Sequence, residues 1–435
     1  MKEVNTHTGS APARMDVMGG IADYSGSLLL QMPMPLHTTV RLKKREDRLF
    51  RISSTSPDGS PVHFQFNYDI PEGISLGEAG KRIRQLDQGD WAVYVLGCFV
   101  VLALEKSLTI QGADMEVQSG IPWGKGLSSS AALEVATLRA ICSAYGLSLG
   151  DIELAVLAQR VENQVVGAAC GLMDQLAVHC GKPGMLLPIV CQPHAIYDPV
   201  AIPAALHFAG IDSGVRHAVG AASYGDVRTA AFMAYSIVAL EEGATRQELQ
   251  QAHATGDWSH LPFKGYLSNI DIETFEGRFA AHLPDTLDGE AFLAEVGVSI
   301  DRATAIDPNK EYHLLVAAEH PVYEHARVER FLSLLQDLQG RGLQEEILIE
   351  MGDLMYQSHM SYSAVGLGNE HTDAIVGMVM EAGPEQGLYG ARISGGGSGG
   401  TVVVMSAGDI GQETLHNLFD RYQKSTKMPV RFFGV

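Results

Sequence analysis

The chain has 435 residues, of which 46% are hydrophobic and 19% charged, and its formal net charge at pH 7 is −20. This length exceeds what one hydrophobic core serves and suits two domains. The negative charge argues against nucleic acid or an anionic membrane surface as the main partner, and no apolar run is long enough to cross a bilayer. The five cysteines form no C-x-x-C pair, and no secretory apolar segment follows Met1. We therefore expect a cytoplasmic protein with reduced thiols.

The first half of the chain alternates between strand and helix patterns. Short apolar, β-branched runs predict strands, and longer periodic runs predict helices. In chain order, the pattern predicts strands at 36–42, 48–53 and 115–118, helices from about Ser130 and over 151–166, and a strand at 185–190.

The second half begins after a proline-marked loop that runs through Pro203, and we expect the domain boundary there. The predicted domains are residues 1–204 and 205–435. The later elements are a strand at 206–212, a mainly helical region at 226–310, a helix at 328–338, and a strand at 401–405 that follows a glycine loop.

The run from Pro122 to Ala132 is a Gly/Ser-rich loop that opens directly into a helix. Unpaired N–H groups at a helix N-terminus suit phosphate, and the serine hydroxyls could reach a phosphate-bound Mg²⁺. The alternative is a turn that only caps a helix. No G-x-x-x-x-G-K-[ST] motif occurs, so phosphate in this acidic chain needs a metal or a local arginine.

Two carboxylates stand between these segments. Asp174 follows Gly171 among apolar neighbours and could act as a base or bind a hydroxyl, although an N-cap role is the alternative. Glu162, near the end of the preceding predicted helix, could face a metal, although an exposed helix charge is the alternative.

Two glycine-punctuated segments lie near the ends of the chain. Arg14 and Asp16 share one face if their segment is a strand, and Asp23 begins a turn; a structural salt bridge plus a turn is the alternative. The run 395–400 contains G-x-G-x-x-G, but it enters a strand near the C-terminus. This context disfavours a dinucleotide site and favours a flexible turn or a close approach to the backbone.

The three segments Pro12–Gly26, Pro122–Ala132 and Ser394–Gly400 occur in the order seen in the galactokinase–homoserine kinase–mevalonate kinase–phosphomevalonate kinase (GHMP) superfamily, which the chain resembles. Within it, the sugar 1-kinases are most similar, through the segment 212–217 leading to Tyr224. The run 14–27 and the segment Val190–Pro193 are similar to the kinase domain of plant L-arabinokinases. The resemblance spans nearly all of the chain and is weakest over 240–320.

The resemblance implies an α+β, two-domain fold, with an N-terminal domain like ribosomal protein S5, a ferredoxin-like C-terminal domain, and the active site in the interdomain cleft. It implies ATP and Mg²⁺ as cofactors, Asp174 and Arg14 as catalytic residues, and Ser130 and Glu162 as metal ligands. Arg14 would offset charge on the transferring phosphoryl group. The implied sugar-binding residues are Asp23, Gly20, Ile21, Gly171, Asp174 and Tyr224. The implied ATP loop is Gly124, Lys125, Gly126, Leu127, Ser128, Ser129 and Ser130.

Galactokinases carry a Glu-His pair where this chain has Gly20 and Ile21, and that pair meets the hydroxymethyl end of the sugar. L-arabinopyranose lacks this group, so the departure favours an ATP-dependent L-arabinokinase that forms L-arabinose 1-phosphate, and it argues against uronic acids. A galactokinase of relaxed specificity and a non-catalytic sugar sensor are the alternatives. The expected partners are a sugar and ATP, with no nucleic acid and no membrane.

Overall fold

The computed structural model describes residues 5–55, 60–67, 69–71, 73–85, 90–168, 170–192, 194–215 and 223–434. The chain forms two compact units. Unit 1 consists of the chain up to Arg14 and residues 33–123 and 127–183, and unit 2 consists of residues 15–32, 124–126 and the chain from Gly184 onward. The first motif and the Gly/Ser loop are therefore each divided between the units. The domain boundary expected between residues 204 and 205 stays a prediction.

A mixed sheet forms one part of unit 1. Its strands follow the order β4-β3-β5-β2, with β3 and β5 parallel and the other neighbours antiparallel, so that Thr38 of β2 faces Ser119 of β5. The predicted strands at 36–42, 48–53 and 115–118 are confirmed as parts of β2, β3 and β5. The strands are β1 (His7–Met18), β2 (Leu28–Lys44), β3 (Leu49–Thr55), β4 (Pro61–Asn67) and β5 (Ala113–Ser119), of which β1 and β2 continue into unit 2.

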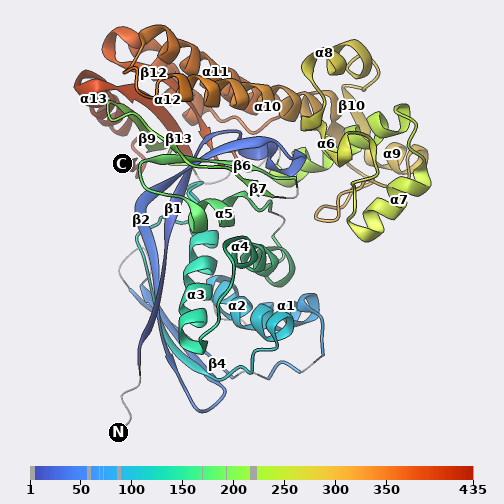
Figure 1. Ribbon diagram of the computed structural model, residues 1–435, viewed down its shortest axis with the longest axis vertical. Coiled ribbons are helices and arrows are strands. Elements are labelled where there is room, and N and C mark those ends of the chain that lie inside the picture. Colours follow the sequence, from blue (N-terminus) through green and yellow to red (C-terminus); the bar gives the residue numbers. More distant parts are fainter. Residues whose placement is uncertain are drawn as a thin grey trace. The chain divides into compact units, whose positions relative to one another are not determined.

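Helices gather on one side of these strands (Figure 1). They are α1 (Leu76–Arg84), α2 (Asp90–Lys106), α3 (Ser129–Tyr145), α4 (Asp151–Arg160) and α5 (Met173–Cys180). The middle of α2, residues 95–102, is buried, as are most residues of α3, whose alanines let its neighbours approach closely. The helix predicted over 151–166 is confirmed, but only its first part is α-helical, because Val161–Val166 form a π-helical turn.

An antiparallel sheet with the order β12-β13-β9-β14 is the centre of unit 2. β9 and β13 run side by side from the pair Leu206 and Ala407 to the pair Asp212 and Thr401. The predicted strands at 206–212 and 401–405 are confirmed, and the glycine loop connects β12, which was not predicted, to β13. The strands of this unit are β6 (Met185–Val190), β7 (Ala195–Ile196), β8 (Val200–Ala201), β9 (Leu206–Asp212), β10 (Thr286–Asp288), β11 (Glu311–His313), β12 (Leu388–Ser394), β13 (Thr401–Ala407) and β14 (Phe432–Phe433).

Helices of unit 2 bury apolar side chains against this sheet and against one another. Val379 and Leu415, for example, pack with Val402 and Val404 in one hydrophobic cluster. The region 226–310 is mainly helical, as predicted, and the helix predicted at 328–338 is the second half of a longer one, α10. The helices are α6 (Tyr224–Glu241), α7 (Arg246–Thr255), α8 (Ile272–Thr274), α9 (Gly289–Glu295), α10 (Leu314–Asp337), α11 (Glu345–Ala364), α12 (Glu370–Ala382) and α13 (Gly408–Thr426).

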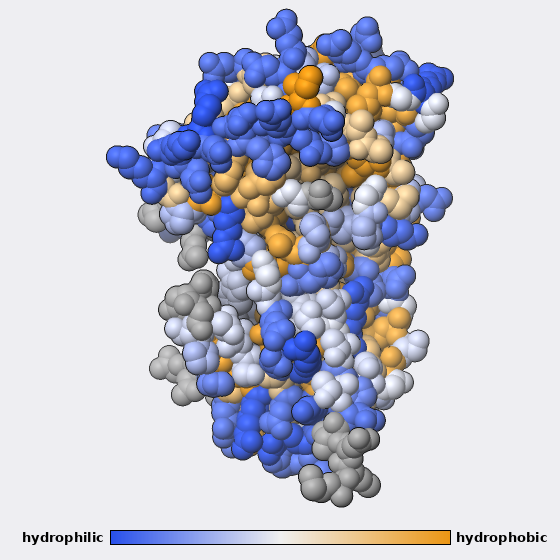
Figure 2. Space-filling view, turned by 90° about the vertical axis from the view of Figure 1, so that its left-hand side faces the viewer, coloured by the Kyte–Doolittle hydropathy of each residue, from blue (hydrophilic) through white to orange (hydrophobic). Residues whose placement is uncertain are grey.

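Polar residues cover much of the face seen in Figure 2, and apolar residues appear there in patches. Exposed apolar side chains include Met360, Met380 and Ile410. In the described part of the chain, none of the helices has the length and apolar character that a bilayer span requires.

Candidate functional site

An arginine–aspartate ion pair lies in unit 1. Arg14, on β1, places Nε 2.8 Å and Nη2 2.7 Å from Oδ1 of Asp174, in the first turn of α5. The arginine side chain is 3% exposed and the aspartate side chain is 27% exposed. The buried guanidinium therefore holds a carboxylate that stays accessible to solvent. Leu172 occupies the N-cap of α5, and its side chain makes no capping bond. The alternative interpretation of Asp174 as an N-cap residue is therefore wrong.

The serines of the Gly/Ser loop stand at the beginning of α3, as predicted. Ser128 is the N-cap, but its backbone lies in the left-handed region at φ 56° and its side chain makes no capping bond. The Ser128 hydroxyl is buried and, among the described residues, has no hydrogen-bond partner. A non-glycine residue in this conformation with an unused buried hydroxyl is typical of a strained functional site, not of a helix cap.

Three acidic side chains of unit 1 interact near this helix start. Glu162, in the π-helical turn, interacts with Ser130, Cys170 and Gln175, and burial together with the charge of Asp174 raises its pKa to about 7. Glu134 of α3 is fully buried; this burial and the charge of Glu162 raise its pKa well above the ordinary value. The Gln175 amide donates to both glutamates, at 3.2 and 2.8 Å. The alternative interpretation of Glu162 as an exposed helix charge is wrong, because the residue is 8% exposed.

These residues fit Mg²⁺, although the described part of the chain holds no group of three His, Cys, Asp or Glu side chains arranged as a metal site. Mg²⁺ prefers oxygen ligands and commonly takes one or two carboxylates together with phosphate oxygens and water. The Ser130 hydroxyl and the Glu162 carboxylate form such an oxygen pair. A nearby cation would also favour the ionised form of a carboxylate whose pKa is raised by burial.

The first residues of the Gly/Ser loop belong to unit 2. Lys125 is 9% exposed, and its Nζ lies 2.9 Å from Oδ1 of the buried Asp212 at the end of β9. The Thr401 hydroxyl donates to the Lys125 carbonyl at 2.7 Å. A Cβ at Gly126 would lie 2.8 Å from the Ser394 carbonyl. Lys125 thus fixes the loop to β9 and β13, and its charge is paired with Asp212.

Two of the expected sugar-binding residues contact each other in unit 2. The Tyr224 hydroxyl, from the first residue of α6, donates to Oδ1 of Asp23 at 2.8 Å. Asp23 is 6% exposed and lies in the 3₁₀ helix Gly20–Ser25, where we predicted a turn. The Tyr24 ring packs edge-on against the Tyr224 ring, with centroids 5.7 Å apart.

Gly20 and Ile21 precede Asp23 and are buried; Ile21 is 2% exposed. Their amides donate to Asp16 and Tyr362, and the Gly19 amide donates to Glu324. Asp16 in turn pairs with Arg392 at 2.9 Å, and both side chains are fully buried. Sequence reasoning assigned no role to Tyr362, Arg392 or Glu324, because no local motif surrounds them.

The other predicted residues take less definite places. Gly171 lies between Cys170, whose amide donates to the Asn163 side chain, and the N-cap of α5. Leu127 is buried and accepts a backbone bond from Arg14, and Ser129 is the first residue of α3. Arg216, His217 and Pro193, which carried part of the resemblance, lie outside the described residues.

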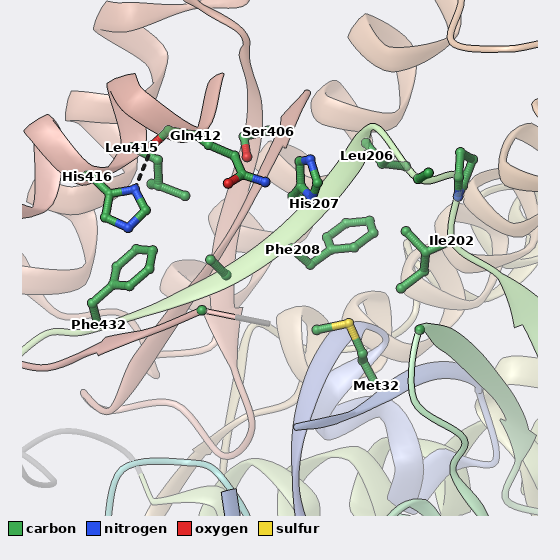
Figure 3. A pocket seen from close by; sticks show the side chains of 15 residues that line it. Met32, Ile202, Leu206, His207, Phe208, Ser406, Gln412, Leu415, His416 and Phe432 are labelled. Carbon is green, nitrogen blue, oxygen red and sulfur yellow. Dashed lines mark hydrogen bonds between the residues drawn. The ribbon is translucent and has the colours of Figure 1, made fainter. Parts of the chain in front are cut away.

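A separate cavity of about 370 Å³ lies in unit 2 and contains none of the predicted site residues. Figure 3 shows Phe208, Met32, Ile202 and Phe432 around it, with the Ser406 and Gln412 side chains at one side. Among the residues that the structure describes, its lining includes no Asp, Glu, Lys or Arg.

Comparisons with protein families match regions that contain two of the three motifs, Pro122–Ala132 and Ser394–Gly400. The GHMP kinase N-terminal domain matches residues 94–182, and the GHMP kinase C-terminal domain matches residues 341–419. The chain is 37% identical to L-arabinokinase from Arabidopsis thaliana over 98% of its own length, but it spans only 45% of that protein. It is 28% identical to galactokinase from Chloroflexus aurantiacus over 93% of the chain and 85% of the relative.

Among solved structures, that of Lactococcus lactis galactokinase complexed with galactose aligns with 100% of this chain and 93% of its own, at a TM-score of 0.68 and 20% identity. This likeness concerns the fold. Together with both domain matches, it shows the expected α+β, two-domain fold. The chain therefore contains the N-terminal and C-terminal domains of the GHMP kinases, and the relatives it is similar to are named as an L-arabinokinase and a galactokinase.

Proposed function

We propose that this chain is an ATP-dependent sugar kinase that phosphorylates the anomeric hydroxyl of L-arabinose to give L-arabinose 1-phosphate and ADP. The observation that carries the proposal is the Arg14–Asp174 pair, since it provides an accessible carboxylate held by a buried guanidinium. The similarity to L-arabinokinase and galactokinase supports the substrate class.

In this proposal, Asp174 orients the anomeric hydroxyl and takes its proton as the oxygen forms a bond to the γ-phosphorus of ATP. The bond between that phosphorus and the β,γ-bridging oxygen breaks, and ADP leaves. Arg14 holds Asp174 in place and offsets charge on the transferring phosphoryl group. A positioned general base typically contributes roughly 10²–10⁴-fold to the rate.

The remaining residues of the proposed site bind the sugar, the phosphates of ATP or Mg²⁺. Asp23 and Tyr224, which already form one hydrogen bond, bind ring hydroxyls of the sugar, and Gly20, Ile21 and Gly171 are the other proposed sugar-binding residues. Residues 124–130 bind the phosphates of ATP, and Ser128 offers a hydroxyl that has no other described partner. Ser130 and Glu162 would hold Mg²⁺, which supplies positive charge against the phosphates when bound.

The preference for L-arabinose is supported by the apolar Ile21 and by Gly20, which has no side chain to offer an exocyclic hydroxyl. A hydroxyl buried without a partner costs about 1–3 kcal/mol, roughly tenfold to a hundredfold in specificity. Replacing Gly20 by glutamate, the obvious test of this idea, is not usable because a Cβ at this position would lie 1.6 Å from the Tyr362 hydroxyl.

The direct test measures ADP release with a panel of pentoses and hexoses, and identifies the product by phosphorus NMR and loss of the reducing end. We expect the highest kcat/KM for L-arabinose and a 1-phosphate product. A higher kcat/KM for D-galactose would replace the proposal by galactokinase activity. Sugar binding without turnover of any sugar would instead favour a sensor.

A further inference from the structure

Tyr362, on α11, joins two segments that are far apart in the sequence. Its side chain is fully buried. The hydroxyl accepts a hydrogen bond from the Ile21 amide at 2.8 Å and donates one to the Gly395 carbonyl at 2.9 Å. One phenol group thus connects the 3₁₀ helix that carries Asp23 to the glycine loop between β12 and β13.

The same hydroxyl occupies the space that a side chain at position 20 would need. A Cβ on Gly20 would lie 1.6 Å from the Tyr362 oxygen, 2.8 Å from its ring carbon Cζ and 2.8 Å from the Arg392 guanidinium. Gly20 also has a φ of +47°, in the left-handed region that favours glycine. Residue 20 is therefore restricted to glycine as long as Tyr362 stays in place.

Neighbouring groups fix the Tyr362 ring. The Arg392 guanidinium lies over the ring at 5.1 Å from its centroid, and the His320 ring meets it edge-on at 5.4 Å. Arg392 is held by the fully buried Asp16 and by the Ser358 hydroxyl, at 2.9 Å each. A ring enclosed in this way has little freedom to move aside for a larger residue 20.

Three consecutive backbone amides each donate a hydrogen bond to a different buried side chain. The Gly19 amide donates to Glu324 at 3.2 Å, the Gly20 amide to Asp16 at 3.1 Å and the Ile21 amide to Tyr362 at 2.8 Å. Among these acceptors, Tyr362 alone is uncharged, and it holds the residue nearest to Asp23. Its hydroxyl therefore fixes the backbone at Ile21, two residues before Asp23.

We infer that Tyr362 is a positioning residue that determines sugar specificity. It fixes the segment 19–23 and keeps any side chain out of position 20. The inference rests on the proposed sugar-binding role of this segment. It predicts that the preference for a sugar without an exocyclic hydroxymethyl group depends on a residue that does not itself touch the sugar.

The test is Tyr362→Phe, which removes both hydrogen bonds and keeps the ring. The matched control is Tyr235→Phe, because Tyr235 belongs to the same hydrophobic cluster, is 1% exposed and donates its hydroxyl to the Pro262 carbonyl at 2.7 Å. We expect Tyr362→Phe to raise KM for the sugar about tenfold or more, as the loss of a buried partner implies. It should lower the ratio of kcat/KM between L-arabinose and D-galactose and leave KM for ATP unchanged. Tyr235→Phe should change neither the ratio of kcat/KM between the two sugars nor KM for the sugar or for ATP.

A second measurement tests the steric part without any substrate. Gly20→Ala is made in the parent and in the Tyr362→Phe background, and unfolding by urea is followed for all four proteins. The alanine should destabilise the parent more than the variant, because removal of the hydroxyl relieves the 1.6 Å contact. Additive effects would overturn the steric coupling, and equal sugar KM values for the two Tyr→Phe variants would overturn the positioning role. A parent that phosphorylates no sugar would overturn the proposed function instead, and the urea data would still decide the coupling.

Discussion

The position of the Asp174 carboxylate distinguishes between the two roles that the sequence allows for it. From the sequence, a capping aspartate and a catalytic one were both open. The structure excludes the capping role, because Asp174 lies inside the first turn of α5. Its carboxylate contacts Arg14, 160 residues earlier in the chain. No local pattern predicts such a contact, and it was expected only through the resemblance to sugar kinases.

Asp174→Asn keeps the shape of the side chain but removes its ability to accept a proton as a carboxylate. We expect kcat to fall by roughly 10²–10⁴-fold, with KM for the sugar changed little. Asp151→Asn is the control, since Asp151 lies in the first turn of α4 in the same unit and its side chain is 81% exposed. Steady-state kinetics of both variants check this. Asp174→Asn activity within about threefold of the parent, well inside that range, would contradict the base role.

Glu162 gives a pH-dependent prediction. Its pKa in the folded protein is about 7, against 4.5 without burial, so folding favours the protonated form. Its contribution to stability is therefore complete below pH 4.5 and is lost as the pH rises through about 7. In EDTA at pH 8, Glu162→Gln should be more stable than the parent by up to about 3 kcal/mol, since one pKa unit corresponds to about 1.4 kcal/mol.

This stability difference should shrink as the pH falls toward 4.5, because the parent carboxyl is then protonated as well. Urea unfolding curves at several pH values measure it. A difference that stays constant with pH would show that the Glu162 carboxyl does not titrate as its burial implies. With MgATP present, the variant should lose its advantage, because the proposed metal site prefers a carboxylate to an amide.

Among the elements, the strands β3, β5 and β9 were predicted, but β4 was missed although its sequence alternates between apolar and polar residues. Short helices and uniformly apolar helices were also missed. The prediction of β9 over 206–212 agrees with the structure at both ends. α2 was not predicted, since the helix is apolar around its whole circumference and gives no helical periodicity. α13 was not predicted either, although Leu415, Leu418 and Tyr422 on its buried face give it an amphipathic pattern.

The start of α3 allows a test that separates a binding role from a structural one. The Ser128 hydroxyl makes no described hydrogen bond, so Ser128→Ala should cost the folded protein little stability. It should raise KM for ATP and leave KM for the sugar unchanged if the hydroxyl binds phosphate. Kinetics and thermal unfolding of the same variant measure both effects.

Ser75→Ala is the control for a serine with a purely structural role at a helix start. Ser75 caps α1 through a capping box with Glu78, so its loss should cost about 0.5–2 kcal/mol of stability and leave both KM values unchanged. If Ser128→Ala behaves like Ser75→Ala, the Ser128 side chain has a structural role only. The left-handed backbone at Ser128 would then have no functional explanation.

At the scale of the whole molecule, the sequence predicted the family and the α+β fold because its three motifs carry strong local signals. It could not predict the buried group of Asp16, Arg392, Glu324 and Tyr362, whose members come from four separate elements of the chain. That group depends on tertiary packing around glycines, which a linear pattern does not record. From the sequence, we expected Gly20 to matter because it has no side chain to meet the sugar. The structure adds a second reason, since Tyr362 packs against Gly20 and leaves no space for a Cβ.

Ligand binding offers a test on the intact, unmodified protein. A ligand that binds only the folded state at 100 times its Kd stabilises it by about 2.7 kcal/mol, which corresponds to several degrees in Tm for a chain of this size. We expect L-arabinose to raise Tm more than D-galactose does at equal concentration, and ATP to raise it more with Mg²⁺ than with EDTA. Thermal unfolding across a concentration series of each ligand gives the apparent affinities without any turnover. A protein that responds to D-galactose more strongly would agree with galactokinase activity, since the Ile21 side chain would then not disfavour an exocyclic hydroxyl. A response to ATP that is independent of Mg²⁺ would contradict the metal-binding roles proposed for Ser130 and Glu162, because the Glu162 carboxylate repels phosphate unless a cation lies between them.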